Sequence, residues 1–295
     1  MSEALAGRRI VITGASRGIG RAVAQRVLAE GARVVINGRD ERALAETASA
    51  LHEDIQGEFV VSAGSVGEFG YAEALISTCV DYYGGIDVLI NCAGIAEPAG
   101  TSILDIDSGD WQELIDVHLT GTFNTCRNAA PLMARQGYGA IINTSSHAFL
   151  GLYGGTGYAA SKGGTNSLSL AMANDLAEKG VDVNVVCPGA KTRLSTGDDF
   201  VAQIERLHRR GSLSDERRAS ALNPASPDYV ASLYAALASV DMAGVSGRMY
   251  WGSGGYMGTF SENEQAVLCA MDHTADDAQP MGTAQLSALL LAGQS

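Results

Sequence analysis

The sequence predicts an α/β protein built on a doubly wound parallel sheet of about seven strands, with helices on both faces. Short apolar runs rich in valine and isoleucine alternate with longer segments of helical periodicity, and short connections join them. This alternation is typical of parallel sheets that helices cover on both sides. A glycine-rich turn also joins the first apolar run to the first helical segment. Together these two observations predict the fold class.

Each element follows from its own stretch of sequence. Apolar runs bounded by glycine or polar residues predict strands at 8–15, 32–38, 57–62, 86–94, 139–146, 181–189 and 247–255. Helical periodicity predicts helices at about 19–30, 41–52, 71–83, 111–135 and 158–178. We therefore expect a strand–helix rhythm without an internal linker or repeat.

Two segments fall outside this rhythm. Residues 191–227 are polar and rich in arginine, and residues 261–295 follow the last predicted strand. We expect a single domain over 1–260 with a lid-like insertion at about 191–227. The insertion forms a solvated helix, or its arginines at 206, 209 and 210 attract an anionic substrate. The C-terminal extension, 261–295, covers the sheet edge or reaches a neighbouring subunit.

The composition limits the partners of the chain. Of its 295 residues, 46% are hydrophobic and 18% are charged, and the formal net charge is −13. This charge disfavours nucleic acid and anionic membranes as partners. The first residues lack the apolar core of a signal peptide, and the five cysteines are odd in number without a CxxC spacing. We expect a soluble, cytoplasmic protein with free thiols.

The glycine-rich turn is TGASRGIG at 13–20, between the first strand and the first helix. Glycine permits a tight turn and lets the backbone approach a pyrophosphate, which a helix N-terminus stabilises. The spacing is GxxxGxG rather than GxGxxG. Its position at the start of a doubly wound pattern indicates a dinucleotide site.

A second pattern is YAASK at 158–162, inside a predicted helix. Residues four apart lie on one helix face, so Tyr158 and Lys162 are neighbours. A nearby ammonium favours the phenolate and so lowers the pKa of tyrosine from its ordinary value of about 10. Such a tyrosine can give a proton to a carbonyl oxygen or take one from an alcohol. The alternative is a surface pair without a catalytic role.

From about residue 6 to about residue 257, the chain resembles the short-chain dehydrogenase/reductase family. The motifs that carry the resemblance are TGASRGIG (13–20), NCAG (91–94) where the family usually has NNAG, IINTSS (141–146), YAASK (158–162) and CPG (187–189), in the family's order. The resemblance implies a Rossmann-type fold and reversible hydride transfer between a nicotinamide dinucleotide and a carbonyl/alcohol pair. It also implies a homodimer or homotetramer, since family members usually pair through the helix that carries the Tyr/Lys motif.

The resemblance assigns roles to individual side chains. Tyr158 would be the general acid in reduction, and Lys162 would lower its pKa and hydrogen-bond the nicotinamide ribose. A serine at the end of the fifth predicted strand would hold the substrate oxygen. Counting back from Tyr158 by the family's usual spacing gives Ser145, whereas matching the strand pattern gives Ser146. We prefer Ser145 and keep both.

The chain departs from the family at His118, within DVHLTGTF, where an asparagine usually supports a proton-relay water. A histidine donates and accepts hydrogen bonds, so His118 could hold the same water or make the relay sensitive to pH. The alternative is a histidine bonded to a backbone carbonyl, with no catalytic part. A similar HLxGxF occurs in the hydroxyacyl-CoA dehydrogenase branch of the family, which suggests a 3-oxoacyl-type substrate.

The charges after the second strand bear on the choice of cofactor. Enzymes of this fold that use NAD place an acidic residue there, but this chain has Gly38 followed by Arg39, and Arg17 lies in the glycine turn. Two guanidiniums favour a 2′-phosphate, and Asp40 is expected to cap the next helix, so we predict NADP(H). The other expected cofactor contacts are Gly14, Ser16, Gly18, Ile19 and Gly20 in the turn, Ser65 and Val66 beside the adenine, Asn91, Ala93 and Gly94 on the ribose side, and Pro188, Gly189 and Thr192 at the nicotinamide.

The predicted activity is NADPH-dependent reduction of a ketone to a secondary alcohol, with a small molecule as substrate and no metal. One alternative keeps the fold but not the redox outcome, as an epimerase, dehydratase or cyclase that uses His118 and Tyr158. Another is a dinucleotide-binding sensor without turnover. Around the candidate site, His147, Phe149, Leu152 and Tyr153 either wall a substrate pocket or make ordinary loop contacts.

Overall fold

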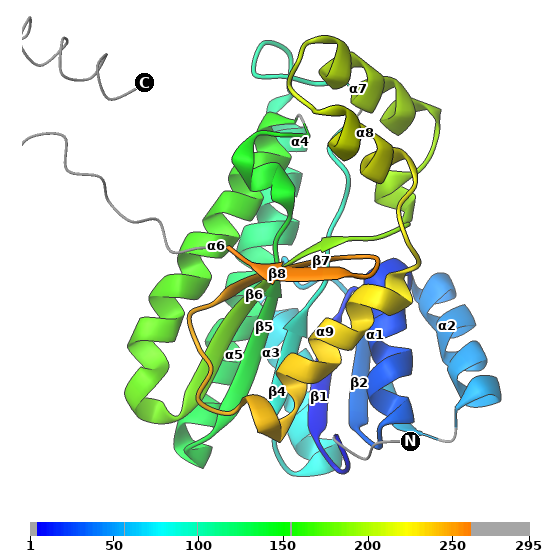
Figure 1. The fold of residues 1–295 in the computed structure, drawn as a ribbon. Coiled ribbons are helices and arrows are strands. Elements are labelled where there is room, and N and C mark those ends of the chain that lie inside the picture. Colours follow the sequence, from blue (N-terminus) through cyan, green and yellow to red (C-terminus); the bar gives the residue numbers. More distant parts are fainter. Residues whose placement is uncertain (1–4, 56, 99, 154, 261–295) are drawn as a thin grey trace, which may run out of the picture. The chain divides into compact units, whose positions relative to one another are not determined.

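The computed structural model describes residues 5–55, 57–98, 100–153 and 155–260 (Figure 1). These residues contain one eight-stranded sheet of order β3-β2-β1-β4-β5-β6-β7-β8. The strands are β1 (Arg9–Thr13), β2 (Arg33–Gly38), β3 (Glu58–Ala63), β4 (Val88–Asn91), β5 (Gly139–Thr144), β6 (Val181–Gly189), β7 (Met249–Ser253) and β8 (Tyr256–Thr259). All neighbouring pairs are parallel except β7 and β8. The predicted doubly wound fold is confirmed, with β8 as one strand more than predicted.

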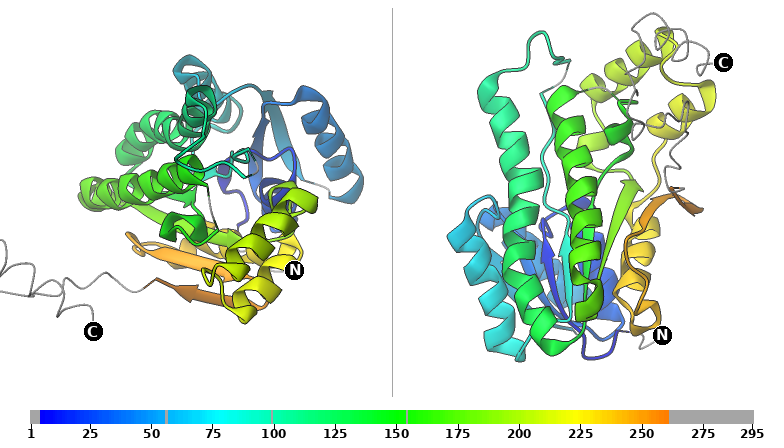
Figure 2. Two further views of the ribbon diagram at one scale, coloured as in Figure 1. Left: turned by 90° about the horizontal axis from the view of Figure 1, so that it is seen from above. Right: turned by 90° about the vertical axis from the view of Figure 1, so that its left-hand side faces the viewer.

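Helices cover both faces of this sheet (Figure 2). The α-helices are α1 (Gly18–Ala29), α2 (Glu41–Asp54), α3 (Phe69–Tyr83), α4 (Ser108–Ile115), α5 (Gly121–Gln136), α6 (Thr156–Leu176), α7 (Asp198–Arg209), α8 (Asp215–Leu222) and α9 (Pro227–Ala238). Apolar residues of α1, α2 and α9 form a core with one face, and those of α3, α5 and α6 form a core with the other. The strands β1, β2, β4, β5 and β6 are largely buried, which explains their nearly continuous apolar sequences.

Three helical regions differ from the sequence prediction. The helix predicted at 111–135 begins at Ser108, and a π-helical turn (Asp116–Thr120) divides it into α4 and α5. The single lid helix expected within the insertion is two helices, α7 and α8. Helix α9 was missed, although it begins with the Ser-Pro pair that often opens helices.

The strand order reverses its direction of growth at β1, which lies between β2 and β4. At such a switch point, the carboxyl ends of the strands leave a crevice in which ligands bind. Gly14 follows β1 with a φ of 66°, and a Cβ there would approach the backbone of Ala93 to 2.7 Å. Only glycine therefore fits at this point of closest approach.

The predicted extension, 261–295, lies outside the described residues, as does Cys269. The division of the chain into a domain over 1–260 and an extension therefore stays a prediction. The other cysteines, at 79, 92, 126 and 187, are free thiols. Among the described helices, none combines the length and apolar character needed to cross a membrane.

Candidate active site

The glycine turn connects β1 to α1 and presents the N-terminus of that helix. Gly18 begins α1 with a φ of 55°, and Arg17 before it is extended and gives the helix no side-chain cap. A Cβ at Gly20 would collide with the backbone of Gly14, so the turn is as tight as the sequence predicts. The first N–H groups of a helix have no partner within it. Those of α1 therefore point to an anion site.

Other predicted residues of this turn support it from beneath. Ile19 packs against the core. The Ser16 carbonyl accepts a hydrogen bond of 2.8 Å from Thr47 Oγ1 in α2. A Cβ at Gly38 would lie 2.9 Å from the Ser16 side chain. A side chain at position 38 would therefore have to displace that of Ser16.

The two arginines beside this turn are exposed and ion-paired. Arg17 Nη2 lies 2.9 Å from Asp40 Oδ2, and Arg39 Nη1 lies 3.1 Å from Glu113 Oε1. Asp40 also accepts a hydrogen bond of 3.0 Å from the Ala43 N–H. The prediction that Asp40 caps the next helix, α2, is thus confirmed. Both guanidiniums therefore lie near the surface with carboxylates beside them.

The residues at the ends of β3 and β4 divide into two groups. Val66 is buried and Ser65 half-buried after β3, and Ala93 and Gly94 follow β4 close to the glycine turn. Thr13 Oγ1 accepts hydrogen bonds of 3.1 Å from the N–H groups of both Cys92 and Ala93, which holds β4 against β1.

The Asn91 side chain takes part in a hydrogen-bond network of the core. Its Nδ2 donates to Asn143 Oδ1 at 2.9 Å, and its Oδ1 accepts from Thr125 Oγ1 at 2.8 Å. The residue is 4% exposed, so its side chain stabilises the core, and a contact of Asn91 with the ribose stays a prediction. Its amide satisfies polar groups that the sheet buries.

The end of β6 faces the glycine turn. Pro188 and Gly189 close this strand and pair in register with Gly252 and Ser253 of β7. A Cβ at Gly18 would lie 3.4 Å from Thr192 Cγ2, so Thr192 lies directly against the turn. The structure therefore brings the predicted contacts from β1 and β6 together.

Tyr158 lies in the first turn of α6 and Lys162 in the second, next to the end of β5. Lys162 Nζ donates to the Thr144 carbonyl at 2.9 Å and lies 5.7 Å from the centroid of the Tyr158 ring. Burial lowers the pKa of Lys162 to about 8. The predicted pairing of the two side chains on one helix face is therefore present in the structure.

The direction of the tyrosine shift differs from the expectation. Burial raises the pKa of Tyr158 above its ordinary value, and a hydrogen bond with the Ser146 side chain opposes that rise. Desolvation of the phenolate outweighs stabilisation by its neighbours because the ring packs in a largely closed corner. Tyr158 is therefore protonated at neutral pH and can donate a hydrogen bond.

The two candidate serines have different environments. Ser145 is 1% exposed, and its hydroxyl donates to the Lys162 carbonyl at 3.2 Å. Ser146 precedes the short helical turn His147–Leu150 and accepts a hydrogen bond of 3.2 Å from the Ala148 N–H. Its hydroxyl lies near the phenol of Tyr158 and acts to lower the pKa of that group. The Ser145 hydroxyl is thus engaged by the main chain of α6, whereas that of Ser146 lies near the phenol of Tyr158. This geometry favours Ser146, and which serine is catalytic stays a prediction.

His118 lies in the π-helical turn and is 1% exposed. Its Nε2 accepts a hydrogen bond of 2.9 Å from the Ile95 N–H, and its Nδ1 lies 2.9 Å from Ser161 Oγ. Burial, reinforced by the positive charge of Lys162, holds the pKa of His118 well below its ordinary value. The partner is a backbone N–H rather than the carbonyl that the non-catalytic alternative expected. Both ring nitrogens are engaged, and the neutral ring stacks edge-on at 5.1 Å from Tyr158.

Glu97 is a residue that the sequence analysis missed. Its Oε2 accepts from the Tyr158 N–H at 2.7 Å, and its Oε1 accepts from the Thr156 N–H at 3.0 Å. Helix α6 has no side-chain cap from Gly155, the residue that precedes it. The missing cap was a signal that some distant acceptor must serve these N–H groups, but the sequence does not identify which one.

The loop after Ser146 packs against the far edge of the sheet. The His147 ring lies 6.2 Å from that of Trp251 and 5.6 Å from that of Phe260, which is also 5.4 Å from Phe149. These contacts favour the packing alternative for His147 and Phe149. Tyr153 is linked to α7, because Gln203 Nε2 donates to its carbonyl at 2.5 Å.

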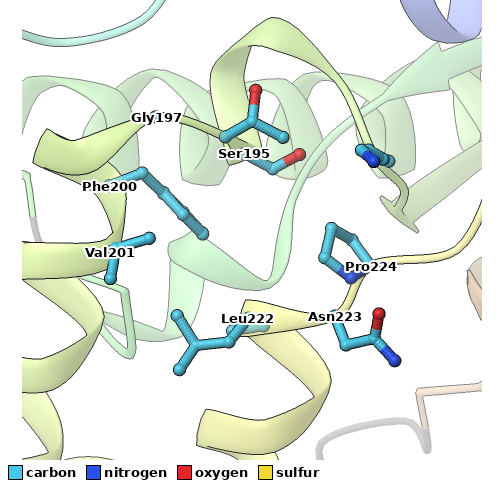
Figure 3. A pocket seen from close by; sticks show the side chains of 10 residues that line it. Ser195, Gly197, Phe200, Val201, Leu222, Asn223 and Pro224 are labelled. Atoms are coloured by element: carbon cyan, nitrogen blue, oxygen red, sulfur yellow. The ribbon is translucent and has the colours of Figure 1, made fainter.

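The insertion contains its own cavity, of about 170 Å³, between α7, α8 and the segment after β6 (Figure 3). Its lining residues are Lys191, Ser195, Thr196, Gly197, Phe200, Val201, Ala221, Leu222, Asn223 and Pro224. None of the candidate catalytic side chains lines it. The cavity therefore belongs to the insertion and is separate from the site around Ser146, Tyr158 and Lys162.

Within the described residues, no group of three or more histidine, cysteine or acidic side chains is placed to hold a metal ion. The polar groups that do converge are those at the ends of β1, β4, β5 and β6. Their arrangement combines an anion site at a helix N-terminus with a half-buried tyrosine beside a buried lysine, which together can hold a dinucleotide and move a proton.

Comparison with known proteins shows what this chain is similar to. The model of the short chain dehydrogenase family matches residues 8–197. A 3beta-hydroxysteroid dehydrogenase 1 from Eggerthella lenta is 34% identical over 86% of this chain and 95% of its own. The hydroxyacyl-CoA dehydrogenase ChsB1 of Mycobacterium tuberculosis is 33% identical over 83% of this chain and 77% of its own. The crystal structure of a short chain dehydrogenase from Mycobacterium avium superimposes with a TM-score of 0.74 and 29% identity, covering 98% of this chain and 95% of that one.

Proposed function

The chain belongs to the short chain dehydrogenase family, and on that premise we propose that it is an NADPH-dependent oxidoreductase that interconverts a ketone and a secondary alcohol. The observation that carries the proposal is the corner formed by Ser146, Tyr158 and Lys162. The phenol has a hydroxyl partner on one side and an ammonium 5.7 Å from its ring centroid on the other. Such an arrangement can donate a proton to a substrate atom that is held beside the phenol.

The residues at the crevice fit a nicotinamide dinucleotide. The uncapped start of α1, in a turn too tight for any residue but glycine at position 20, suits a pyrophosphate. When bound, the nicotinamide supplies or accepts the hydride. Gly14, Gly18 and Thr192 would line the phosphates and the carboxamide of the bound dinucleotide, and Lys162 would contact its nicotinamide ribose.

The proton is handled by the chain's own side chains. The raised pKa keeps Tyr158 protonated at neutral pH, so it donates its proton to the ketone oxygen as the alcohol forms. Ser146 holds the same oxygen by a hydrogen bond. Lys162, with a pKa of about 8, is mostly charged at neutral pH and stabilises the phenolate that remains.

Preference for NADP(H) over NAD(H) rests on the rim of the crevice. Position 38 is a glycine and lacks the carboxylate that would bind a ribose 2′-hydroxyl, and Asp40 is occupied as the cap of α2. Arg17 and Arg39 remain as the charged groups beside this site, where a 2′-phosphate would compete with Asp40 and Glu113 for them.

The relatives guide the choice of substrate. Their names give a hydroxysteroid and a hydroxyacyl-CoA as what they act on, and both substrates carry a hydroxyl group. We therefore propose a small molecule with a ketone or secondary alcohol, of the 3-oxoacyl or 3-oxosteroid kind. A homodimer or homotetramer in the cytoplasm stays a prediction.

The proposal is tested by following the oxidation of NADPH by absorbance, with a 3-ketosteroid and a 3-oxoacyl-CoA as substrates. Wild type should turn over at least one of them, and Tyr158→Phe should lower kcat by about 100- to 10,000-fold, the usual contribution of a general acid. Tyr82→Phe, at a position 67% exposed on α3, is the matched control and should behave as wild type.

Two results would contradict the proposal. One is full activity in Tyr158→Phe. The other is conversion of a substrate without consumption of NADPH, which would indicate an epimerase, dehydratase or cyclase instead. Tight NADPH binding in both proteins without any turnover would favour a dinucleotide-binding sensor.

A further inference from the structure

The main chain of Tyr158 is held on both sides by the loop that follows β4. On one side, its N–H donates to Glu97 Oε2 at 2.7 Å. On the other, its carbonyl accepts a hydrogen bond of 2.8 Å from Ser161 Oγ. Ser161 Oγ lies 2.9 Å from His118 Nδ1.

These contacts lead back to the loop that carries Glu97. His118 Nε2 accepts from the N–H of Ile95, only two positions before Glu97. The Ile95 N–H is a donor, so the proton of the neutral His118 ring is on Nδ1, which donates to Ser161. Every donor in the circuit then has an acceptor. The segment 95–97 thus holds the main-chain N–H of Tyr158 directly, through Glu97, and its main-chain carbonyl indirectly, through His118 and Ser161.

Glu97 has no local substitute among the described residues. Tyr158 is the third residue of α6, so its N–H has no acceptor within the helix. Gly155 offers no side chain to cap the helix. A carboxylate that accepts two of these N–H groups also interacts favourably with the helix dipole. Thr101 Oγ1 in turn donates to Glu97 Oε1 at 3.1 Å, which fixes the orientation of the carboxylate.

We propose that Glu97 is a positioning residue for the reaction, which fixes the first turn of α6 so that the Tyr158 hydroxyl stays beside Ser146 and the substrate oxygen. The inference rests on the proposed role of Tyr158. Glu97 touches the backbone of that residue and not the reacting atoms. Its loss changes how often the phenol is in place, so it lowers kcat and leaves ground-state binding nearly unchanged.

The test uses Glu97→Ala and Glu97→Gln beside wild type, with Tyr158→Phe as the reference for loss of the general acid. Glu46→Gln is the matched control, because Glu46 lies on α2 with its side chain 64% exposed. The measurements are kcat and KM for the ketone, the Kd of NADPH by fluorescence, and amide hydrogen exchange of the segment that begins α6.

We expect Glu97→Ala to lower kcat by about 100-fold, with KM and Kd within about threefold of wild type. Glu97→Gln keeps one acceptor oxygen in place and should recover part of this loss, to about tenfold below wild type. Exchange at the start of α6 should rise in Glu97→Ala and rise less in Glu97→Gln. Glu46→Gln should match wild type in all of these.

The inference is overturned if folded Glu97→Ala keeps kcat within about twofold of wild type while Tyr158→Phe is inactive. It is also overturned if KM or Kd rises as much as kcat falls, since Glu97 would then act in binding. Retained activity in Tyr158→Phe removes the proposed function itself, and the inference with it. The two failures are therefore seen in different variants.

Discussion

Two charged regions of the molecule differ in how far their side chains are exposed to water. One is the tyrosine corner, formed by Ser146, Tyr158 and Lys162, and the other is the arginine rim, formed by Arg17 and Arg39. In the corner, Lys162 is 4% exposed and hydrogen-bonded to the main chain of β5. At the rim, the side chains of Arg17 and Arg39 are 51% and 61% exposed, and each pairs with an exposed carboxylate. The corner removes its polar groups from water, whereas the rim leaves them in it.

This difference predicts how strongly each region responds to mutation. Buried polar groups with fixed partners are strongly coupled, because removing one leaves another unsatisfied in a medium of low dielectric. Exposed ion pairs contribute little in water and exchange partners easily. The corner therefore suits chemistry that needs fixed geometry, and the rim suits recognition of a phosphate that replaces one partner by another.

The two neighbouring serines offer the sharpest test of the corner. Ser146→Ala should lower kcat by about 100- to 1,000-fold, because it removes the hydroxyl beside the phenol that would hold the substrate oxygen. Ser145→Ala should change kcat by less than about threefold and lower the free energy of unfolding by about 1–2 kcal/mol, since it removes a buried hydrogen bond to α6.

The measurements are steady-state kinetics and urea unfolding of the two variants side by side. The opposite order of activities, with Ser145→Ala as the weaker enzyme, would restore the spacing argument from the sequence. It would also show that the orientation of Ser146 toward Tyr158 is not the one used in the reaction.

Lys162 gives a test of burial that does not depend on turnover. Its pKa is lowered to about 8 in the folded protein from 10.5, so between these pH values the unfolded chain binds more protons than the folded one. The free energy of unfolding therefore rises with pH across this window. From below pH 8 to above pH 10.5, the difference between wild type and Lys162→Met should shift toward wild type by about 3 kcal/mol.

This shift is measured by urea unfolding at several pH values. Lys179→Met, at an exposed position after α6, serves as control, and its difference from wild type should not change with pH in the same way. A constant difference for Lys162→Met would mean that the ammonium is not desolvated in the corner.

The smallest effect is expected at the rim. Arg39→Ala and Arg17→Ala should each lower kcat/KM for NADPH by about tenfold, the loss of one charge-assisted hydrogen bond at an exposed site. The kcat/KM for NADH should change by less than about threefold, because NADH has no 2′-phosphate. Arg42→Ala, an exposed α2 residue paired with Glu46, is the control. Equal losses with both cofactors would refute a role for these arginines in selecting NADP(H).

Much of this site could be predicted because it depends on local spacing. The glycine turn requires only that one strand, a few small residues and one helix follow each other, and the close approach of Gly20 to the backbone of Gly14 comes from this order. The pairing of Tyr158 with Lys162 depends only on helical periodicity. The alternation of strands and helices likewise predicted a doubly wound parallel sheet, whereas the order of its strands comes from the structure.

The contacts that could not be predicted are those between residues far apart in the chain. The amide of Asn91 satisfies buried groups of β5 and α5, which the sequence does not place beside it. The choice between Ser145 and Ser146 depends on which hydroxyl the end of β5 turns toward α6. A shift of one residue reverses that direction, and spacing alone cannot detect it.

By itself, the sequence determined the doubly wound fold, the tight glycine turn after β1 and the pairing of Tyr158 with Lys162, because each follows from short-range spacing or periodicity. Only the tertiary structure decided that Glu97 holds the helix of this pair, across 61 positions of the chain, and that His118 is enclosed by Ile95 and Ser161. Hydrogen bonds between distant residues leave no pattern in a single sequence. They form because a polar group that the core buries must find its hydrogen-bond partner within the folded protein.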